Sequence, residues 1–145
     1  MIAVGPAALL MVGALAGCSP DDSARGSLSQ SAGTAASAAR AAGLVLGLHE
    51  QDQVLSTVED TGLTDVADRL AQEAQTVSTM AAIGGIGARR DSVLADIRAA
   101  QDVVTAAQRA EASGKDSPAT VDRQRRELDR LAQELQAASQ RLERE

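Results

Sequence analysis

His49 is the only histidine of this 145-residue chain, and two carboxylates, Glu50 and Asp52, follow it closely. An imidazole and a carboxylate three residues apart on a helix share one face, which could begin a metal site. Zinc normally takes three or four protein ligands, whereas His49 and Asp52 supply only two. The pattern therefore favours an exposed or capping histidine, and the sequence predicts neither a metal site nor a cofactor.

Nucleophilic catalysis requires a general base within hydrogen-bonding reach of a hydroxyl or a thiol. His49 has no recognisable partner motif, and the chain contains no Gly-x-Ser-x-Gly sequence. Adjacent carboxylates such as Asp21 and Asp22 fall in predicted loops or helix ends, where no pocket would raise a pKa for acid–base catalysis. We therefore predict that the protein is not an enzyme.

The single cysteine, Cys18, offers a different chemistry, which is acylation of its thiol. It directly follows Leu15, Ala16 and Gly17, which close an apolar segment over residues 2–16. That segment has about the length of a signal-peptide hydrophobic region and is shorter than the roughly 20 apolar residues of a membrane-spanning helix. The four residues from Leu15 to Cys18 resemble the lipobox of bacterial lipoprotein precursors.

The resemblance to bacterial lipoprotein precursors implies that residues 1–17 are a signal peptide and that a peptidase cuts before Cys18. Leu15, Ala16 and Gly17 would be the residues that the peptidase recognises. The Cys18 sulfur would carry a diacylglycerol thioether with fatty chains such as palmitate. Two acyl chains give stable anchoring, because each buried methylene contributes roughly 0.8 kcal/mol. The implied location is the extracytoplasmic face of the cell membrane.

One feature departs from the lipoprotein pattern, because residues 1–4 contain no Lys or Arg where a signal peptide is normally basic. Either translation starts further upstream, or the free amino terminus orients the segment by itself. Two other interpretations of residues 1–17 stay open at this point. They are an uncleaved membrane anchor and an ordinary buried helix.

Composition and charge restrict the remaining possibilities. The chain has no aromatic residue and a net charge of −6. Residues 19–88 carry nine acidic and three basic side chains, whereas residues 89–145 carry eleven of each. Nucleic-acid binding requires clustered cations and usually stacking aromatics, so we expect no nucleic-acid partner. The same charge balance disfavours a second, electrostatic attachment to anionic lipid.

The rest of the chain is expected to form a polar tether over residues 18–27, including the lipidated Cys18, and one helical domain over residues 28–145. Apolar residues recur every three or four positions, which predicts helices at about 28–58, 65–82, 88–112 and 118–144. In the first helix the apolar stripe runs from Leu28 to Leu46 and then shifts to Leu44, Leu48, Leu55 and Val58. The residues expected to face inward are Leu28, Ala32, Ala35, Ala39, Ala42 and Leu46 in the first helix, Ala67, Leu70, Ala74, Val77 and Ala81 in the second, and Val93, Ile97, Ala100, Val104 and Ala107 in the third.

Breaks between these helices are predicted from residues that start or stop helices. Asp60, Thr61 and Gly62 interrupt the pattern, and Thr64 is a suitable N-cap for the second helix. The glycines within residues 84–87 predict a tight turn, and Gly114 ends the third helix. Ser117 and Pro118 then supply the N-cap and first position of the fourth. Gly43 and Gly47 predict close packing against another helix of the same chain.

The fourth helix carries the clearest heptads. Val121, Leu128, Leu135 and Leu142 share one register, and Gln124, Leu131 and Ala138 occupy the other seam position. Glu127, Glu134 and Arg141 flank the seam, where charges usually select a partner helix. The candidate interaction face predicted from this pattern consists of Val121, Leu128, Leu131, Leu135 and Leu142. The same heptads would serve packing within the chain equally well.

The predicted fold class is all-α, with about four helices in an elongated antiparallel bundle or coiled coil after an N-terminal signal helix. The predicted function is a lipid-anchored, extracytoplasmic, non-catalytic module that binds another envelope protein or has a structural role there. The alternative is an accessory protein that holds a lipid or a small apolar ligand between its helices. The sequence leaves the oligomeric state open.

Overall fold

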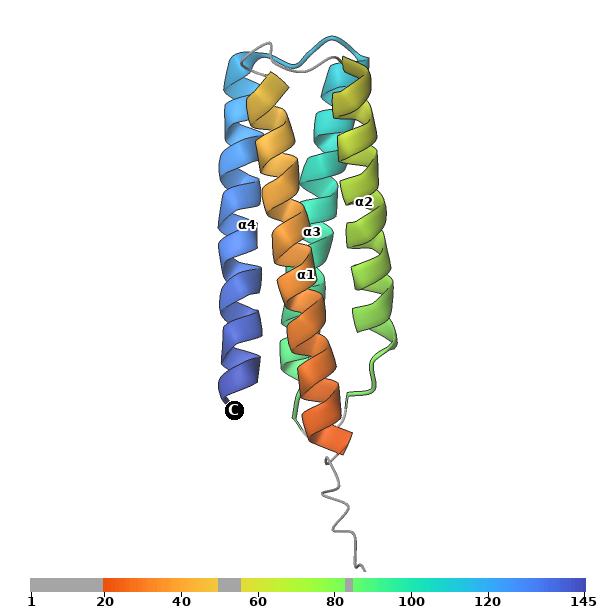
Figure 1. Ribbon diagram of the computed structural model, residues 1–145, viewed down its shortest axis with the longest axis vertical. Coiled ribbons are helices and arrows are strands. Elements are labelled where there is room, and N and C mark those ends of the chain that lie inside the picture. Colours follow the sequence, from red (N-terminus) through yellow and green to blue (C-terminus); the bar gives the residue numbers. More distant parts are fainter. Residues whose placement is uncertain (1–19, 50–55, 83–84) are drawn as a thin grey trace, which may run out of the picture.

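The computed structural model describes residues 20–49, 56–82 and 85–145, and these form four α-helices with no strand among them (Figure 1). The helices are α1 (Pro20–His49), α2 (Ser56–Thr79), α3 (Gly87–Ala112) and α4 (Pro118–Arg144). They run alternately up and down, so that each helix is antiparallel to its neighbours, and α4 closes the bundle against α1. The prediction of an all-α, elongated antiparallel bundle is confirmed.

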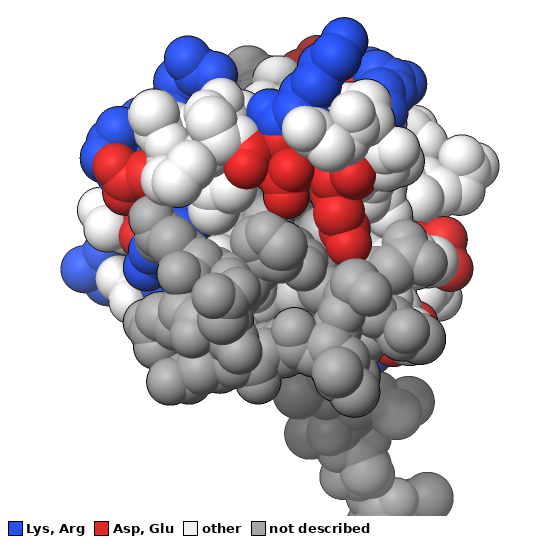
Figure 2. All heavy atoms as spheres, turned by 90° about the horizontal axis from the view of Figure 1, so that it is seen from above, with Lys and Arg blue, Asp and Glu red and all other residues white. Residues whose placement is uncertain are grey.

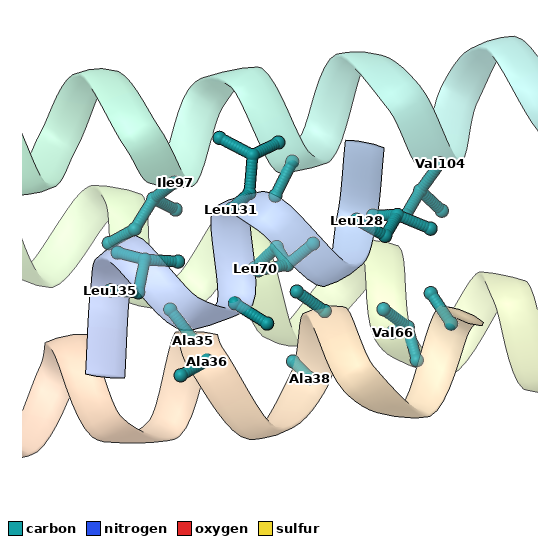
Figure 3. Packing of buried hydrophobic residues seen from close by; sticks show 14 of the residues in the cluster. Ala35, Ala36, Ala38, Val66, Leu70, Ile97, Val104, Leu128, Leu131 and Leu135 are labelled. Atoms are coloured by element: carbon teal, nitrogen blue, oxygen red, sulfur yellow. The ribbon is translucent and has the colours of Figure 1, made fainter. Parts of the chain in front are cut away.

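The core consists of aliphatic side chains contributed unequally by the four helices (Figure 3). α1 supplies mostly alanines, whereas the larger side chains, such as Leu70, Ile97 and Leu128, come from the other three helices. All six residues predicted to face inward from the first helix are buried, as are the five predicted from the third. In the second helix Leu70 and Val77 are buried, Ala67 and Ala74 are half-buried, and Ala81 lies exposed beyond the end of α2.

The predicted tether is wrong for residues 20–27, because α1 begins at Pro20 and not near residue 28. Proline suits the first turn of a helix, where its missing N–H has no partner to lose. Asp21 and Asp22 follow in that turn, where carboxylates interact favourably with the helix dipole. Serine hydroxyls also find partners within the helix, since Ser27 Oγ donates to the Ser23 carbonyl at 2.9 Å. The polar composition of this segment is therefore compatible with a helix.

The predicted break at Asp60, Thr61 and Gly62 is also wrong, because α2 starts at Ser56 and passes through all three residues. Gly62 permits close helix packing here: a Cβ atom on it would lie 3.3 Å from Cγ2 of Val45 in α1. Thr64 lies inside α2 and is no N-cap; its Oγ1 accepts a hydrogen bond from Gln108 of α3 at 3.4 Å. The helix ends at Thr79, three residues before the predicted end.

The C-terminal end of α3 and the start of α4 contain the capping residues that the sequence predicts. Gly114 has a φ of +60°, a conformation that glycine adopts without strain, and its N–H donates to the Glu111 carbonyl at 2.9 Å. Gly85 in the α2–α3 turn likewise has a positive φ of +84°. Ser117 Oγ accepts from the Thr120 N–H at 3.3 Å, and Pro118 occupies the first helical position.

We expect Ser117→Ala to lower the free energy of unfolding by about 1 kcal/mol, because the first turn of α4 would lose the side-chain acceptor of its N-cap. Urea titration followed by circular dichroism at the helical band measures this change. Ser117→Asp keeps an acceptor at the same position and is the matched control, expected to lie close to the unchanged protein. Equal stability of the two variants would contradict the capping role.

Candidate functional site

The predicted lipidation site lies outside the described residues, which begin at Pro20. This applies to Cys18 and to the recognition residues Leu15, Ala16 and Gly17. Covalent geometry still limits where Cys18 can be, since consecutive Cα atoms are about 3.8 Å apart. Only Ser19 separates the two residues, so the Cα atom of Cys18 lies within about 7.6 Å of that of Pro20. Any lipid on Cys18 is therefore attached at the start of α1.

His49 is the last residue of α1, and its two candidate partners, Glu50 and Asp52, fall outside the described part of the chain. Within the described part, no group of three His, Cys, Asp or Glu side chains is placed to hold a metal ion. No helix formed by these residues is long and apolar enough to span a bilayer.

The candidate interaction face on α4 is not exposed, which corrects the prediction. Its five members are at most 4% accessible and belong to the core cluster of this chain: Val121, Leu128, Leu131, Leu135 and Leu142. The heptad pattern correctly identified a packing seam, but the other helices of the same bundle occupy it. An additional partner helix therefore has no access to these side chains in the folded chain.

The flanking charges of α4 pair along α4 itself. Arg130 donates to Glu134 at 2.6 Å and also bonds Glu127, and Arg126 pairs with Asp122 one turn away. The hydrogen bond from Arg130 lowers the pKa of Glu127, and the same bond raises the pKa of Arg130. These pairs are exposed, so each contributes little to stability. Figure 2, which looks onto the end where α4 begins, shows acidic and basic side chains interspersed.

The most extensive helix contact is between α1 and α4, along a stripe of small residues on α1. A Cβ atom on Gly43 would lie 3.5 Å from Asp129 Oδ1, and one on Gly47 would lie 3.1 Å from the Arg125 guanidinium. Gly47 lies four residues after Gly43 on α1, and its partner Arg125 lies four residues before Asp129 on α4. This is the register expected of antiparallel helices. The predicted role of Gly43 and Gly47 in packing within the chain is confirmed.

A polar cluster occupies the other end of the same α1–α4 seam. Ser29 Oγ lies 3.1 Å from both the carbonyl oxygen and Oγ of Ser139, and it donates to Glu143 at 3.2 Å. Both serines are 4% accessible, so these bonds satisfy buried hydroxyls where α1 and α4 meet. No histidine or second acid lies among the partners that the structure gives to Ser29. The cluster fixes the register of the two helices.

Asp96 of α3 is half-buried at the α3–α4 contact. Burial raises the pKa of Asp96, and the nearby carboxylate of Glu134 raises it further, while Arg130 and Arg141 oppose these effects. A perturbed carboxyl group can indicate catalysis only together with a second reacting group. Here its neighbours are components of the ion-pair network of α4, which favours a structural role.

Three surface grooves follow the contacts between helices. The groove between α3 and α4 has a volume of about 660 Å³, with Val103 and Ala106 among its apolar lining and Arg123, Arg126 and Arg130 among its charged lining. Grooves of about 540 Å³ and 430 Å³ flank α1 on its α4 and α2 sides. All three grooves are open to solvent, so none provides the enclosure that buries most of a small apolar ligand.

The arginines at the start of α3 interact with neighbouring helix ends. Arg90 Nη1 donates to the Met80 carbonyl at 2.9 Å, just after α2 ends, and Arg89 pairs with Glu145 beyond the end of α4. A cation is unfavourable at the N-terminus of its own helix and favourable at the C-terminus of an antiparallel neighbour. The packing therefore accounts for two arginines in the first turn of α3, where the dipole of their own helix disfavours a cation.

Sequence reasoning missed one exposed feature, the leucine pair Leu44 and Leu48 on α1. Their side chains are 70% and 41% accessible, although the apolar stripe predicted for the first helix shifts to include both. They lie one turn apart near the end of α1 opposite Pro20. A hydrophobic pattern on one helix does not distinguish a core from an exposed contact surface, and no other sequence signal marks this pair.

Comparison with protein-family models, with curated proteins and with solved structures found no significant match to this chain.

Proposed function

We propose that this protein is an extracytoplasmic lipoprotein, in which the Cys18 sulfur carries the membrane anchor and residues 20–144 form a non-catalytic helical module of the cell envelope. The observation that carries the proposal is the sequence Leu15, Ala16, Gly17 and Cys18 at the end of a short apolar segment. The position of this sequence relative to the bundle supports it, since α1 begins two residues later. An anchor at that point leaves all four helices free of the bilayer interior.

An interaction or structural role fits the described residues better than catalysis does. The buried hydroxyls bond one another and a carboxylate, and the exposed charges pair along the helix surfaces. The exposed leucine pair of α1 supports a contact with another protein, because large apolar side chains are otherwise buried in this part of the chain. α1 has 30 residues, so Leu48 lies about 42 Å along the helix from Pro20. A partner bound there would sit well above the membrane surface.

The test is expression of the full chain in a bacterial host, followed by mass spectrometry of the N-terminal peptide from the membrane fraction. We expect a chain that starts at Cys18 and carries acyl chains on its sulfur. Cys18→Ala removes the acceptor thiol, so the acyl mass should disappear and residues 1–17 should be retained, with loss of the mature membrane-bound form.

A matched control moves the thiol without removing it. Ser23→Cys in the Cys18→Ala background places the only cysteine five residues downstream, inside α1 and away from Leu15, Ala16 and Gly17. This variant should also lack acyl chains. A bare Cys18 sulfur in the mature protein, or mature processing that persists in Cys18→Ala, would refute the proposal.

A further inference from the structure

The end of the bundle that holds the start of α1 also holds the turn between α2 and α3 (Figure 1). The antiparallel arrangement requires this, since α2 returns to the level at which α1 began. The contact between Arg90 and the Met80 carbonyl closes the turn, and Ile86 within it is only 1% accessible. The described residues on either side of positions 83–84 are therefore held at the end of the bundle where α1 begins.

The α2–α3 turn differs in chemistry from the turn at the opposite end. Residues 78–88 contain no charged side chain, and the described positions Ala81, Ala82, Gly85 and Ala88 are exposed. At the opposite end, the connection between α3 and α4 contains Lys115 and Asp116. An uncharged surface can approach a bilayer without the free-energy cost of removing water from an ion.

Several of the charges near the α2–α3 turn form ion pairs. Arg90 pairs with Asp91 at 2.7 Å, and Arg89 pairs with Glu145. At the start of α1, Arg25 lies 3.5 Å from Asp22. Paired charges of this kind remain compatible with the polar headgroup layer, where water is still present.

We propose that the bundle stands on the bilayer with the α2–α3 turn against the lipid headgroups and the helix axes pointing away from the membrane. The inference rests on the proposed lipidation of Cys18, whose Cα atom lies within about 7.6 Å of that of Pro20. An anchor this close to the first turn of α1 leaves little slack, so the end that contains the anchor must stay near the headgroups. The flanks of the bundle carry the exposed ion pairs of α4 and remain in water.

The absence of aromatic residues gives a direct test, because one introduced tryptophan would be the only one in the chain. Three exposed alanines provide matched sites: Ala82 in the turn, Ala71 on the flank of α2, and Ala119 at the opposite end in α4. Each single-tryptophan chain is purified in its membrane-bound form and reconstituted in phosphatidylcholine vesicles containing lipid brominated on its acyl chains. Quenching of the tryptophan emission measures its proximity to the bilayer.

We expect quenching of Trp emission in Ala82→Trp that is several-fold stronger than in Ala71→Trp or Ala119→Trp, accompanied by a shift to shorter wavelength. Tryptophan itself prefers the interface, and the three variants share this preference equally. Stronger quenching in Ala71→Trp would show that the bundle lies on its side and would overturn the inference. Equally weak quenching in all three would show that the turn stays away from the bilayer and would overturn it as well.

The mass of the N-terminal peptide separates this inference from the proposed function. An acylated Cys18 with an unquenched tryptophan at position 82 would leave the anchor intact and reject only the upright orientation. A bare Cys18 would reject the proposed function together with the orientation that rests on it.

Discussion

Leu128→Ala is expected to lower the free energy of unfolding by about 2–5 kcal/mol, the range found when a large buried aliphatic side chain is truncated and leaves a cavity. Leu128 is fully buried and points into the cluster that also contains Val104 of α3 (Figure 3). Its neighbours come from the same chain, so they cannot close the space without moving a whole helix. Thermal and urea unfolding followed by circular dichroism measure the loss.

Leu44→Ala is the matched control, because it removes the same atoms from a side chain that is 70% accessible. Its effect should stay within about 0.5 kcal/mol, as is usual for surface substitutions. The unfolding midpoints of the unchanged and Leu128→Ala proteins should not vary with protein concentration. A midpoint that rose with concentration would show that Leu128 packs at an interface between chains, as the heptads alone also permit.

The two C-terminal helices could be predicted from the sequence almost to the residue. α4 starts and ends as predicted, and α3 starts one residue earlier than predicted and ends at the predicted position. The reason is local: Ser117, Pro118 and Gly114 each act on the backbone of the turn in which they stand, whatever packs nearby. The regular spacing of Val, Ile and Leu then identified the buried face of each of these two helices, although it did not show which helices pack against that face.

The boundary between α1 and α2 could not be predicted in the same way. A glycine in a helical pattern can end a helix or admit a neighbouring side chain, and Gly62 does the second for Val45. The choice depends on a side chain 17 positions away, which a local pattern does not contain. The same limit applies to the start of α1, where the polar residues after Pro20 suit both a tether and a helix.

The candidate site shows what periodicity leaves undetermined. The pattern on α4 predicts that Leu128 and Leu135 are buried, which the structure confirms, but it does not specify the surface that buries them. The neighbouring helices α1 and α3 of the same chain do so, and the flanking Glu127 bonds Arg130 of the same helix. Cys18 is a different case, since its proposed role depends on recognition of a short sequence by other proteins and not on the fold.

Ala36→Leu is expected to lower the free energy of unfolding by about 1–3 kcal/mol, because it adds a large side chain where α1 has only small ones against α4. Ala36 is fully buried, one turn from Gly33 and two from Gly43, on the face of α1 that meets α4. A Cβ atom on Gly33 would lie 3.4 Å from Ser139 Oγ, so a single added carbon there would already contact α4. The added side chain must push the two helices apart or leave its preferred rotamer.

Ala71→Leu makes the same substitution at an exposed position of α2 and should be nearly neutral, since alanine and leucine both favour helices. Limited trypsin digestion adds a readout specific to α1, whose only cleavage sites are Arg25 and Arg40. Arg40 donates to Gln136 of α4 at 3.3 Å. A leucine side chain at position 36 should weaken that contact and speed cleavage after Arg40. Unchanged cleavage together with unchanged stability in Ala36→Leu would show that α1 does not depend on close contact with α4. In that event, close packing against α4 would not explain why α1 has small residues on the face that meets α4.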